Sequence, residues 1–353
     1  MCKEVMGSGI EIAVQAAVYA VFLILVLAGI KTDRTLPDEK EALSRLNRLR
    51  GVFALEVIAG HVVRYENCLL FPFGKFMICS VAFFFFVSGF GLAHSFKEKD
   101  NYLNLRYLLT KPVFLAIAAV ITYIVYYITG IVGPVELKYV KADVLRGLYS
   151  GTNWYIKEQI LFYLLFFAVY KLIKKHGWII ITAATLVVVL IFYYCGKSEA
   201  WVASAFGFPM GVLIGEKYDR LKKYIYGVPG IVTGILAAGA GLITLFIRNE
   251  NIFTMVVLRN LLCIGVLLCI IALCGRVHLC YNRAAVFLTG ISAQLYLFQF
   301  VWLEVSELVW EEYLIRLAFV VVMTILCAVL VSPLFKLLRD VLSGRHKKTE
   351  SHP

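Results

Sequence analysis

Long apolar runs separated by short polar segments recur from one end of the chain to the other. Each run holds about 20 residues, which is enough for one α-helix to cross a hydrocarbon core of about 30 Å. Helices are the expected form because lipid offers backbone groups no hydrogen-bond partners. We predict eleven helices, at residues 10–30, 51–70, 76–96, 112–132, 154–173, 178–195, 200–215, 226–247, 253–274, 284–304 and 314–335.

Composition agrees with this pattern. Hydrophobic residues make up 61% of the 353 positions and charged residues only 16%, with a mean hydropathy of +0.82. A soluble domain of this length carries more charge. The predicted fold class is therefore an all-α polytopic transmembrane helical bundle, with about ten core helices plus one extra N-terminal helix.

Three segments are expected along the chain. Residues 1–44 hold the extra helix and a hydrophilic linker, residues 45–338 the membrane domain, and residues 339–353 a basic tail. The first apolar run has some features of a signal peptide. It is longer than a usual signal core and no Ala-x-Ala site follows it, so we favour a retained helix.

The net charge of +12 has a topological explanation. In a soluble protein it would suggest a nucleic-acid partner. Here 24 of the 35 lysines and arginines fall in alternate polar segments, on one side of an eleven-helix bundle. That side is predicted to be cytoplasmic by the positive-inside rule. We expect a plasma-membrane protein whose N-terminus lies outside and whose C-terminus lies inside, with membrane lipids as partners and no nucleic acid.

The nine cysteines give no indication of a metal site. No pair has the Cys-x-x-Cys spacing typical of zinc or redox motifs, and most lie within apolar runs. We interpret them as small buried hydrophobic residues and expect no metal.

The second apolar run, LRGVFALEVIAGHV at residues 49–62, contains Arg50, Glu56 and His61. Ionisable groups within a membrane usually face a bundle interior or a wet cavity. On a helix, Arg50 and His61 differ by only about 20° around the helix axis, so they share one face, and they lie about 16 Å apart along the axis. One elongated ligand could therefore contact both. Glu56 lies about 240° from Arg50, and we expect it to pair with another helix. The alternative is that Arg50 is only an anchor at the membrane rim and His61 only a packing residue.

Arginine, ten residues and then histidine in the first core helix resembles the signature of the acyltransferase-3 family of integral membrane acyltransferases. Four further segments resemble family motifs in the same order along the chain, and the resemblance covers about residues 45–338. These segments are FFFFVSGFGL (83–92), NLRYLLTKP (104–112), NWYIKEQILFYLLF (153–166) and ISAQLYLFQF (291–300).

The resemblance implies transfer of an acyl group, commonly acetyl, from cytoplasmic acyl-CoA to a hydroxyl of an extracytoplasmic or lipid-linked glycan. The residues agree with this reaction. CoA carries phosphates, and Arg50, Arg106 and Lys111 are basic residues on the predicted cytoplasmic side. A neutral imidazole can take a proton from a hydroxyl, so His61 is predicted as the general base or as a transient acyl carrier.

Other candidate site residues follow from the family motifs. Glu158 is predicted to line the outer mouth and orient His61 or the acceptor, or else to be a solvated residue at a helix start. Asn153, Trp154 and Tyr155 are candidates for binding the acceptor. An N-cap and an interfacial aromatic belt are the alternatives for them. Ser88, from the Ser-Gly-Phe motif, is a further candidate for binding substrate.

Three positions depart from the family pattern. Lys111 stands where the family usually has a second arginine, and a lysine offers a point charge rather than a planar fork. Glu158 lies four residues after Trp154, whereas many members carry a glutamate pair five and six residues after it. Gln299 stands where the late helix often has histidine, so it cannot act as a base, and we expect it to face the bundle.

Two other classes of function stay open on the sequence. The first alternative is a transporter or flippase of glycan or lipid precursors without acyl chemistry, although the halves of the chain show no internal repeat. The second is a sensor or scaffold that uses the fold without turnover.

Overall fold

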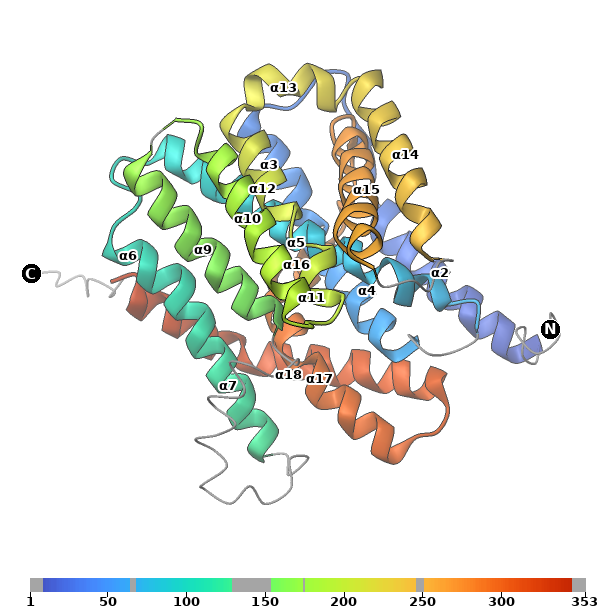
Figure 1. Cartoon of the computed structure of the whole chain (residues 1–353). Helices are drawn as coiled ribbons and strands as arrows, with labels where there is room; N and C mark the ends of the chain where they lie inside the picture. The colour runs from blue at the N-terminus through green and yellow to red at the C-terminus, as the bar shows by residue number, and fades with distance from the viewer. Residues whose placement is uncertain (1–8, 64–67, 129–153, 174, 246–250, 345–353) are drawn as a thin grey trace, which may run out of the picture.

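Almost all described residues of the computed structural model are helical (Figure 1). The described residues are 9–63, 68–128, 154–173, 175–245 and 251–344. Six of their helices are long and apolar enough to cross a membrane, or up to eight if each of two bent pairs counts as one span. The prediction of an all-α multi-pass bundle is therefore confirmed.

The first half of the chain follows the predicted runs, with one short helix. The second predicted helix, 51–70, corresponds to α4, which covers about 21 Å over the described residues 50–63, and residues 68–70 are not helical. The helices are α2 (Gly9–Leu27), α3 (Glu39–Arg48), α4 (Arg50–Val63), α5 (Phe71–Glu98), α6 (Leu105–Leu108), the π-helical η1 (Leu109–Val113), α7 (Phe114–Ile128), α9 (Trp154–Leu172) and α10 (Gly177–Tyr194).

The second half contains two bends that the apolar runs do not show. The chain turns by 73° between α13 and α14, and by 73° between α16 and α17. The helices are α11 (Ala200–Ala203), α12 (Gly207–Glu216), α13 (Tyr218–Ile225), α14 (Val228–Leu242), η3 (Ile243–Leu245), the π-helical η4 (Phe253–Leu258), α15 (Arg259–Cys274), α16 (Arg283–Gly290), α17 (Ser292–Val309) and α18 (Tyr313–Leu342).

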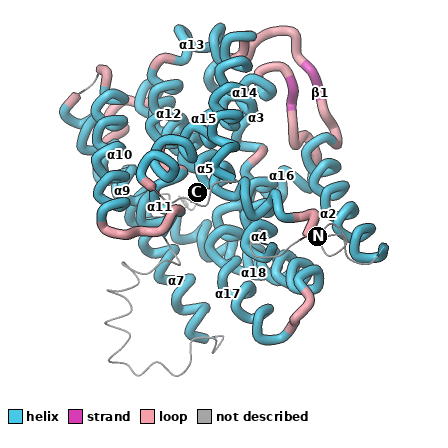
Figure 2. Tube along the Cα trace, turned by 45° about the vertical axis from the view of Figure 1, so that its right-hand side comes forward, coloured by secondary structure: helices cyan, strands magenta, loops and turns pink. Residues whose placement is uncertain are grey.

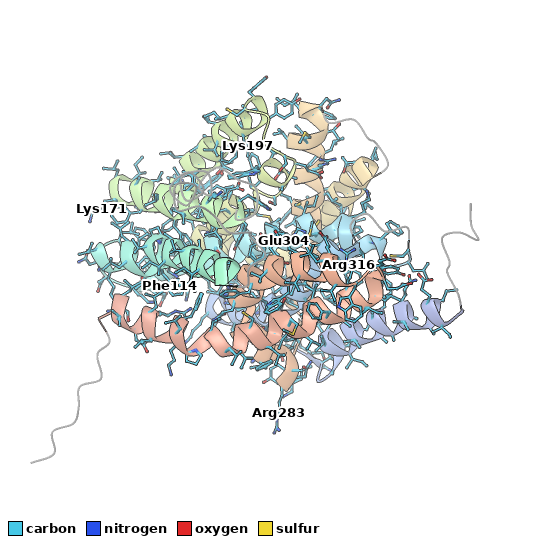
Figure 3. The ribbon with its side chains drawn as sticks, turned by 90° about the horizontal axis from the view of Figure 1, so that it is seen from below. Phe114, Lys171, Lys197, Arg283, Glu304 and Arg316 are labelled. Carbon is cyan, nitrogen blue, oxygen red and sulfur yellow. The ribbon has the colours of Figure 1, made fainter. Side chains whose placement is uncertain are left out.

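Helix α5 lies at the centre of the bundle and packs against α4 and α12 (Figure 1). Small residues allow this close approach. A Cβ atom added to Gly207 would lie 2.2 Å from the Ala82 carbonyl oxygen, and one on Gly211 would lie 2.1 Å from that of Phe86. The Gly-x-x-x-Gly spacing on α12 therefore serves helix contact, as in other membrane bundles. Helices α17 and α18 form a second pair at the edge, where Arg316 of α18 bonds to Glu307 of α17 at 2.9 Å (Figure 3).

Helix α2 lies on the outside of the bundle, with only 6% of its apolar window buried. Polar contacts attach it to the core at two levels. The Gln15 side chain accepts a hydrogen bond from the Leu69 backbone amide at 2.7 Å, and Asn282 donates to the Leu25 carbonyl at 2.8 Å. The extra N-terminal helix is thus a peripheral element that a few specific bonds hold in place.

The hydrophilic linker after α2 folds back onto the core. Strand β1 (Lys31–Thr32) pairs antiparallel with β2 (Val277–His278), shown in magenta in Figure 2, and the amphipathic α3 follows. Arg45 of α3 is buried and donates to the carbonyls of Cys274 and Gly275. The buried arginine joins two segments that are more than 200 residues apart.

Contacts gather the predicted basic segments at one end of the bundle. Lys97 pairs with Glu39, and the Tyr218 hydroxyl donates to the Pro37 carbonyl at 2.9 Å. The His176 backbone amide donates to Glu216 at 3.1 Å. The alternation of loops that the charge pattern predicted is thus present in the fold, and we call this end of the molecule the Arg50 end.

Candidate functional site

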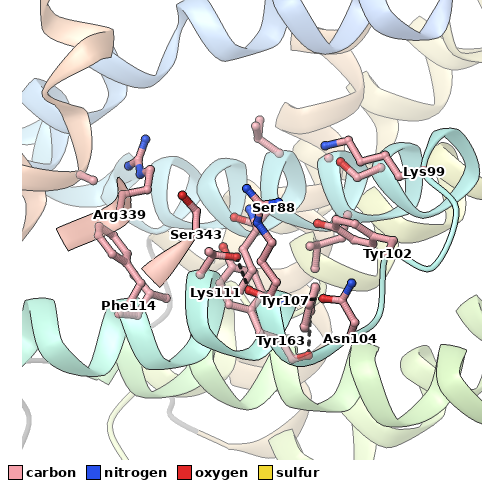
Figure 4. Close-up of a pocket in the computed structure, with 18 of the residues that line it drawn as sticks. Ser88, Lys99, Tyr102, Asn104, Tyr107, Lys111, Phe114, Tyr163, Arg339 and Ser343 are labelled. Carbon is pink, nitrogen blue, oxygen red and sulfur yellow. Dashed lines mark hydrogen bonds between the residues drawn. The ribbon is translucent and has the colours of Figure 1, made fainter. Parts of the chain in front are cut away.

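A pocket of about 870 Å³ opens at the Arg50 end, a size typical of small-molecule sites (Figure 4). Its walls come from segments far apart in the chain: α3, α4, α5, the α5–α6 connection, α6, η1, α7, α9, α17 and α18. The contributing residues span Leu43 to Ser343. The pocket is therefore a product of the whole fold.

Basic side chains dominate the charge of this pocket. The three residues predicted to bind CoA all line it, and two further cations join them. The acidic residues on its wall are Asp100 and Asp340, and the basic ones are Arg50, Lys99, Arg106, Lys111 and Arg339. The excess of positive charge suits an anionic ligand with several phosphates.

Lys111 reaches the pocket from an irregular turn. Pro112 has no amide hydrogen and cannot continue a regular α-helix, and the chain forms the π-helical η1 around it. The Lys111 ammonium nitrogen lies 6.0 Å from the centre of the Tyr163 ring. The Thr110 hydroxyl caps the turn by donating to the Arg106 carbonyl at 2.7 Å. This turn places two of the predicted CoA ligands on one wall.

Each residue of the Ser-Gly-Phe motif lies in a different environment. Ser88 lines the pocket beside Tyr163 (Figure 4). Gly89 faces α12, where an added Cβ atom would lie 2.3 Å from the Phe208 carbonyl oxygen. Phe90 is buried and stacks on the Tyr218 ring at 5.9 Å. Close packing on one side of α5 therefore fixes the serine on the other.

Arg339 and Lys99 are pocket residues that no motif in the sequence indicated. Helix α18 continues to Leu342, and Arg339 on its last turns stands over the Phe114 ring, 5.3 Å from the ring centre. Arg339 lies in a basic segment near the C-terminus, and nothing in the sequence distinguished it from the other lysines and arginines of that segment. The same holds for Lys99, which lies in a polar connection among other charged residues.

His61 faces the bundle three turns above Arg50. Its ring is half-buried and packs edge-on against Phe300 of α17, with ring centroids 4.7 Å apart. Arg50 lines the pocket and His61 does not. The idea that one ligand contacts both residues stays a prediction.

Glu56 points to a different neighbour, as its helical position predicts. It accepts a hydrogen bond from Ser80 of α5. The expected pairing with another helix is confirmed, and this glutamate joins α4 to α5.

Glu158 lies inside the bundle with only 1% of its surface exposed. Neither carboxylate oxygen has a hydrogen-bond partner among the described residues. It is close enough to Tyr155 and Tyr296 to act electrostatically on both phenols. The alternative of a solvated helix-start residue is wrong, because the first turn of α9 packs inward. A buried polar group without a partner is costly, and such costs are commonly retained for function.

The aromatic residues at the start of α9 also face inward. Tyr155 is half-buried and packs against Phe85 at 4.9 Å and Tyr296 at 4.6 Å, and acceptor binding and an interfacial belt both stay predictions for it. Trp154 is half-buried against Trp201, with ring centroids 6.2 Å apart. Asn153 lies outside the described residues.

Gln299 is 1% exposed and faces the bundle, as expected. Its amide nitrogen donates to the Tyr296 carbonyl at 3.0 Å, whereas its side-chain oxygen has no partner among the described residues. Gln299 and Glu158 are thus two buried polar residues of the bundle interior that have side-chain oxygens without a hydrogen-bond partner among the described residues.

One cluster of two carboxylates and a histidine has the spacing of a metal site, but an arginine forms salt bridges with both carboxylates. Asp33, Glu41 and His278 bring possible ligand atoms within 4.8 Å of one another. The Arg45 guanidinium lies 2.5 Å from both carboxylates. The hydrogen bond from His278, with Arg45 nearby, keeps the pKa of Asp33 below its usual value. The cluster therefore works as a salt-bridge network between the linker and the core.

The bundle and its pocket define a multi-pass membrane protein with a basic pocket at one end. A family model described as an acyltransferase domain matches residues 43–333, and the chain belongs to this acyltransferase-3 family. It is thus a membrane acyltransferase. No match was found to a curated protein or to a solved structure.

Proposed function

We propose that this protein transfers an acyl group, typically acetyl, from acyl-CoA to a hydroxyl of an extracytoplasmic or lipid-linked glycan. The observation that carries the proposal is the basic pocket at the Arg50 end, with His61 three turns away on the same helix. In this proposal the Arg50 end faces the cytoplasm of the cell, because the lysines and arginines concentrate there.

The pocket provides what the CoA moiety needs. Arg50, Arg106 and Lys111 bind its phosphates, and Lys99 and Arg339 add positive charge on the facing walls. The narrow pantetheine arm then extends from Ser88 and Tyr163 toward the middle of the bundle. A ligand placed in this way carries its thioester toward the His61 side.

The chemistry on the far side is an ester-forming transfer. His61 takes the proton of the acceptor hydroxyl, and the oxygen attacks the thioester carbonyl carbon. The C–O bond forms, the C–S bond breaks, and the CoA thiolate leaves and is protonated. Glu158, which is buried in the bundle interior, is assigned to positioning the imidazolium or the acceptor. In a variant of this route, His61 itself carries the acyl group between two such steps.

The experiment follows transfer of label from radioactive acetyl-CoA to membrane glycans. Isolated cell membranes with their own glycans receive wild-type protein, His61→Ala or His176→Asn. The control His176 is an exposed residue with φ of +61° at the start of α10, a conformation that asparagine tolerates. We expect wild-type and control membranes to incorporate label and His61→Ala to incorporate none.

Full incorporation by His61→Ala would remove this histidine from the mechanism. Wild-type incorporation no higher than in membranes without the protein would contradict the proposed donor or acceptor. Mass spectrometry of surface glycans, with and without the protein, then identifies the ester and its sugar.

A further inference from the structure

Three residues on consecutive turns of α17 lie at increasing distance from the pocket. Ala293 lines the pocket, Tyr296 lies one turn further along, and Phe300 contacts His61 one turn beyond that. Consecutive turns on one face lie about 5 Å apart. Tyr296 therefore occupies the level between the pocket and His61.

Helix α5 shows the same order in the opposite chain direction. Ser88 lines the pocket and Phe84 lies one turn away from it. One further turn away, Ser80 bonds to Glu56 of α4. Measured along the helix axes from the pocket, Phe84 therefore lies at a level between Arg50 and Glu56 of α4. His61 lies further from the pocket than this level. Two helices place an aromatic residue at the same intermediate level.

Phe84 and Tyr296 both contact the ring of Tyr155 of α9, so three aromatic rings pack together at this level. The Phe84 centroid lies 6.2 Å from that of Tyr155 and 6.3 Å from that of Tyr296, and Tyr155 lies 4.6 Å from Tyr296. Phe84 and Tyr296 are each 5% exposed. Such distances are those of rings in contact, with no space for a chain between them.

We infer that Phe84, Tyr155 and Tyr296 form an aromatic barrier between the donor pocket and His61, and that this barrier limits the size of the transferred acyl group. The inference rests on the proposed function. The acyl group is the leading end of the donor and has to pass the three rings before it meets the acceptor oxygen. Rotation of the rings admits a two-carbon group more readily than a longer chain.

The test compares two donors in the same sample. Initial rates of CoA thiol release are measured with acetyl-CoA and hexanoyl-CoA in isolated membranes that contain their own glycans. We expect the ratio of kcat/KM for hexanoyl-CoA to that for acetyl-CoA to rise at least about tenfold in Phe84→Ala and in Tyr296→Ala, as expected for removing a steric limit on several methylenes. Phe84→Leu should give an intermediate rise. The ratio is independent of how much variant protein folds.

Phe86→Ala is the matched control. Phe86 is a fully buried phenylalanine of the same helix that packs on Phe90 at 6.0 Å, away from the barrier. Its ratio should equal that of the wild type.

Acetyl-CoA turnover by the wild type with an unchanged ratio in all barrier variants would overturn the barrier and leave the proposed function intact. So would an equal rise in Phe86→Ala, or loss of turnover with both donors in every barrier variant. Absence of turnover by the wild type with either donor would overturn the proposed function and the barrier together.

Discussion

The two ends of α4 lie in different surroundings. At Arg50 the bundle opens into a pocket whose walls carry five cations, and at least one of them, Arg339, is exposed. At His61 the half-buried ring packs edge-on against Phe300, and in the bundle interior Glu158 is buried with neither oxygen hydrogen-bonded within the described chain. The two ends are only about 16 Å apart.

The difference reflects two physical demands. Charges that bind phosphate can stay partly hydrated, because their attraction to a multiply charged ligand is strong enough in a wet pocket. A proton transfer and a thioester attack gain from a site that excludes water and competing hydrolysis. One short helix thus connects a place for recognition with a place for reaction in the proposed transfer. Substitutions at the two ends should therefore change different kinetic constants.

The largest effect is expected in the bundle interior, from Glu158→Gln. The change removes the carboxyl group that positions the reacting groups, and kcat should fall about 10²- to 10⁴-fold with little change in KM for acyl-CoA. The same variant should be about as stable to heat in detergent, because a buried carboxyl group without a partner is commonly neutral and an amide has nearly the same size.

Acetyl transfer and thermal unfolding measure the two properties on one preparation. Glu304→Gln is the matched control, a half-buried carboxylate on α17 (Figure 3). An unchanged kcat in Glu158→Gln would show that the transfer does not need this carboxyl group.

The next largest effect belongs to the scaffold of the Arg50 end. Arg45→Ala leaves Asp33 and Glu41 without their cation and two buried carbonyls without a donor. Because the two carboxylates are partly exposed, most of the loss comes from the two buried carbonyls, and a buried acceptor without a donor costs about 1–3 kcal/mol in the free energy of unfolding. Thermal unfolding in detergent measures it, with the exposed Lys40→Ala as control. Equal melting temperatures for both variants would contradict a structural role for this network.

Within the pocket itself, Lys111→Gln should raise KM for acyl-CoA about tenfold, the equivalent of one lost charge-assisted bond. Its kcat should change little, because the interaction is made equally in the ground and transition states. Lys111→Arg should retain the wild-type KM. Saturation curves measure both constants, and Lys223→Gln removes an exposed lysine away from the pocket as a control. A fall in kcat alone would place Lys111 on the reaction side.

Arg339→Gln is expected to have the smallest effect. This side chain is exposed, so its contribution is screened and KM should rise no more than about fivefold. The rise should disappear at high salt, where Lys111→Gln keeps part of its effect because Lys111 is half-buried. Saturation curves at two salt concentrations test this. A larger effect at high salt than at low salt would contradict the electrostatic explanation.

Patterns along the chain predicted much of this arrangement. The apolar runs located the helices, and Arg50, Arg106 and Lys111, which were predicted to bind CoA, line one pocket. The bends before α14 and before α17 were missed, since hydropathy reports how long an apolar run is and not its direction. Glu158 was uncertain for a similar reason. A carboxylate one turn into a helix fits both a solvated start and a buried site, and only neighbouring helices decide between them.

Local information was sufficient for features that depend on a single helix or loop: the apolar spans, the shared face of Arg50 and His61, and the alternation of basic segments. Backbone hydrogen bonding and lipid set these features within about 20 residues. The three-dimensional packing decided the rest. Arg339 enters the pocket, and Phe84, Tyr155 and Tyr296 meet, because helices distant in the chain pack side by side. Such contacts follow from the shapes of all the packed helices together, which no single segment encodes.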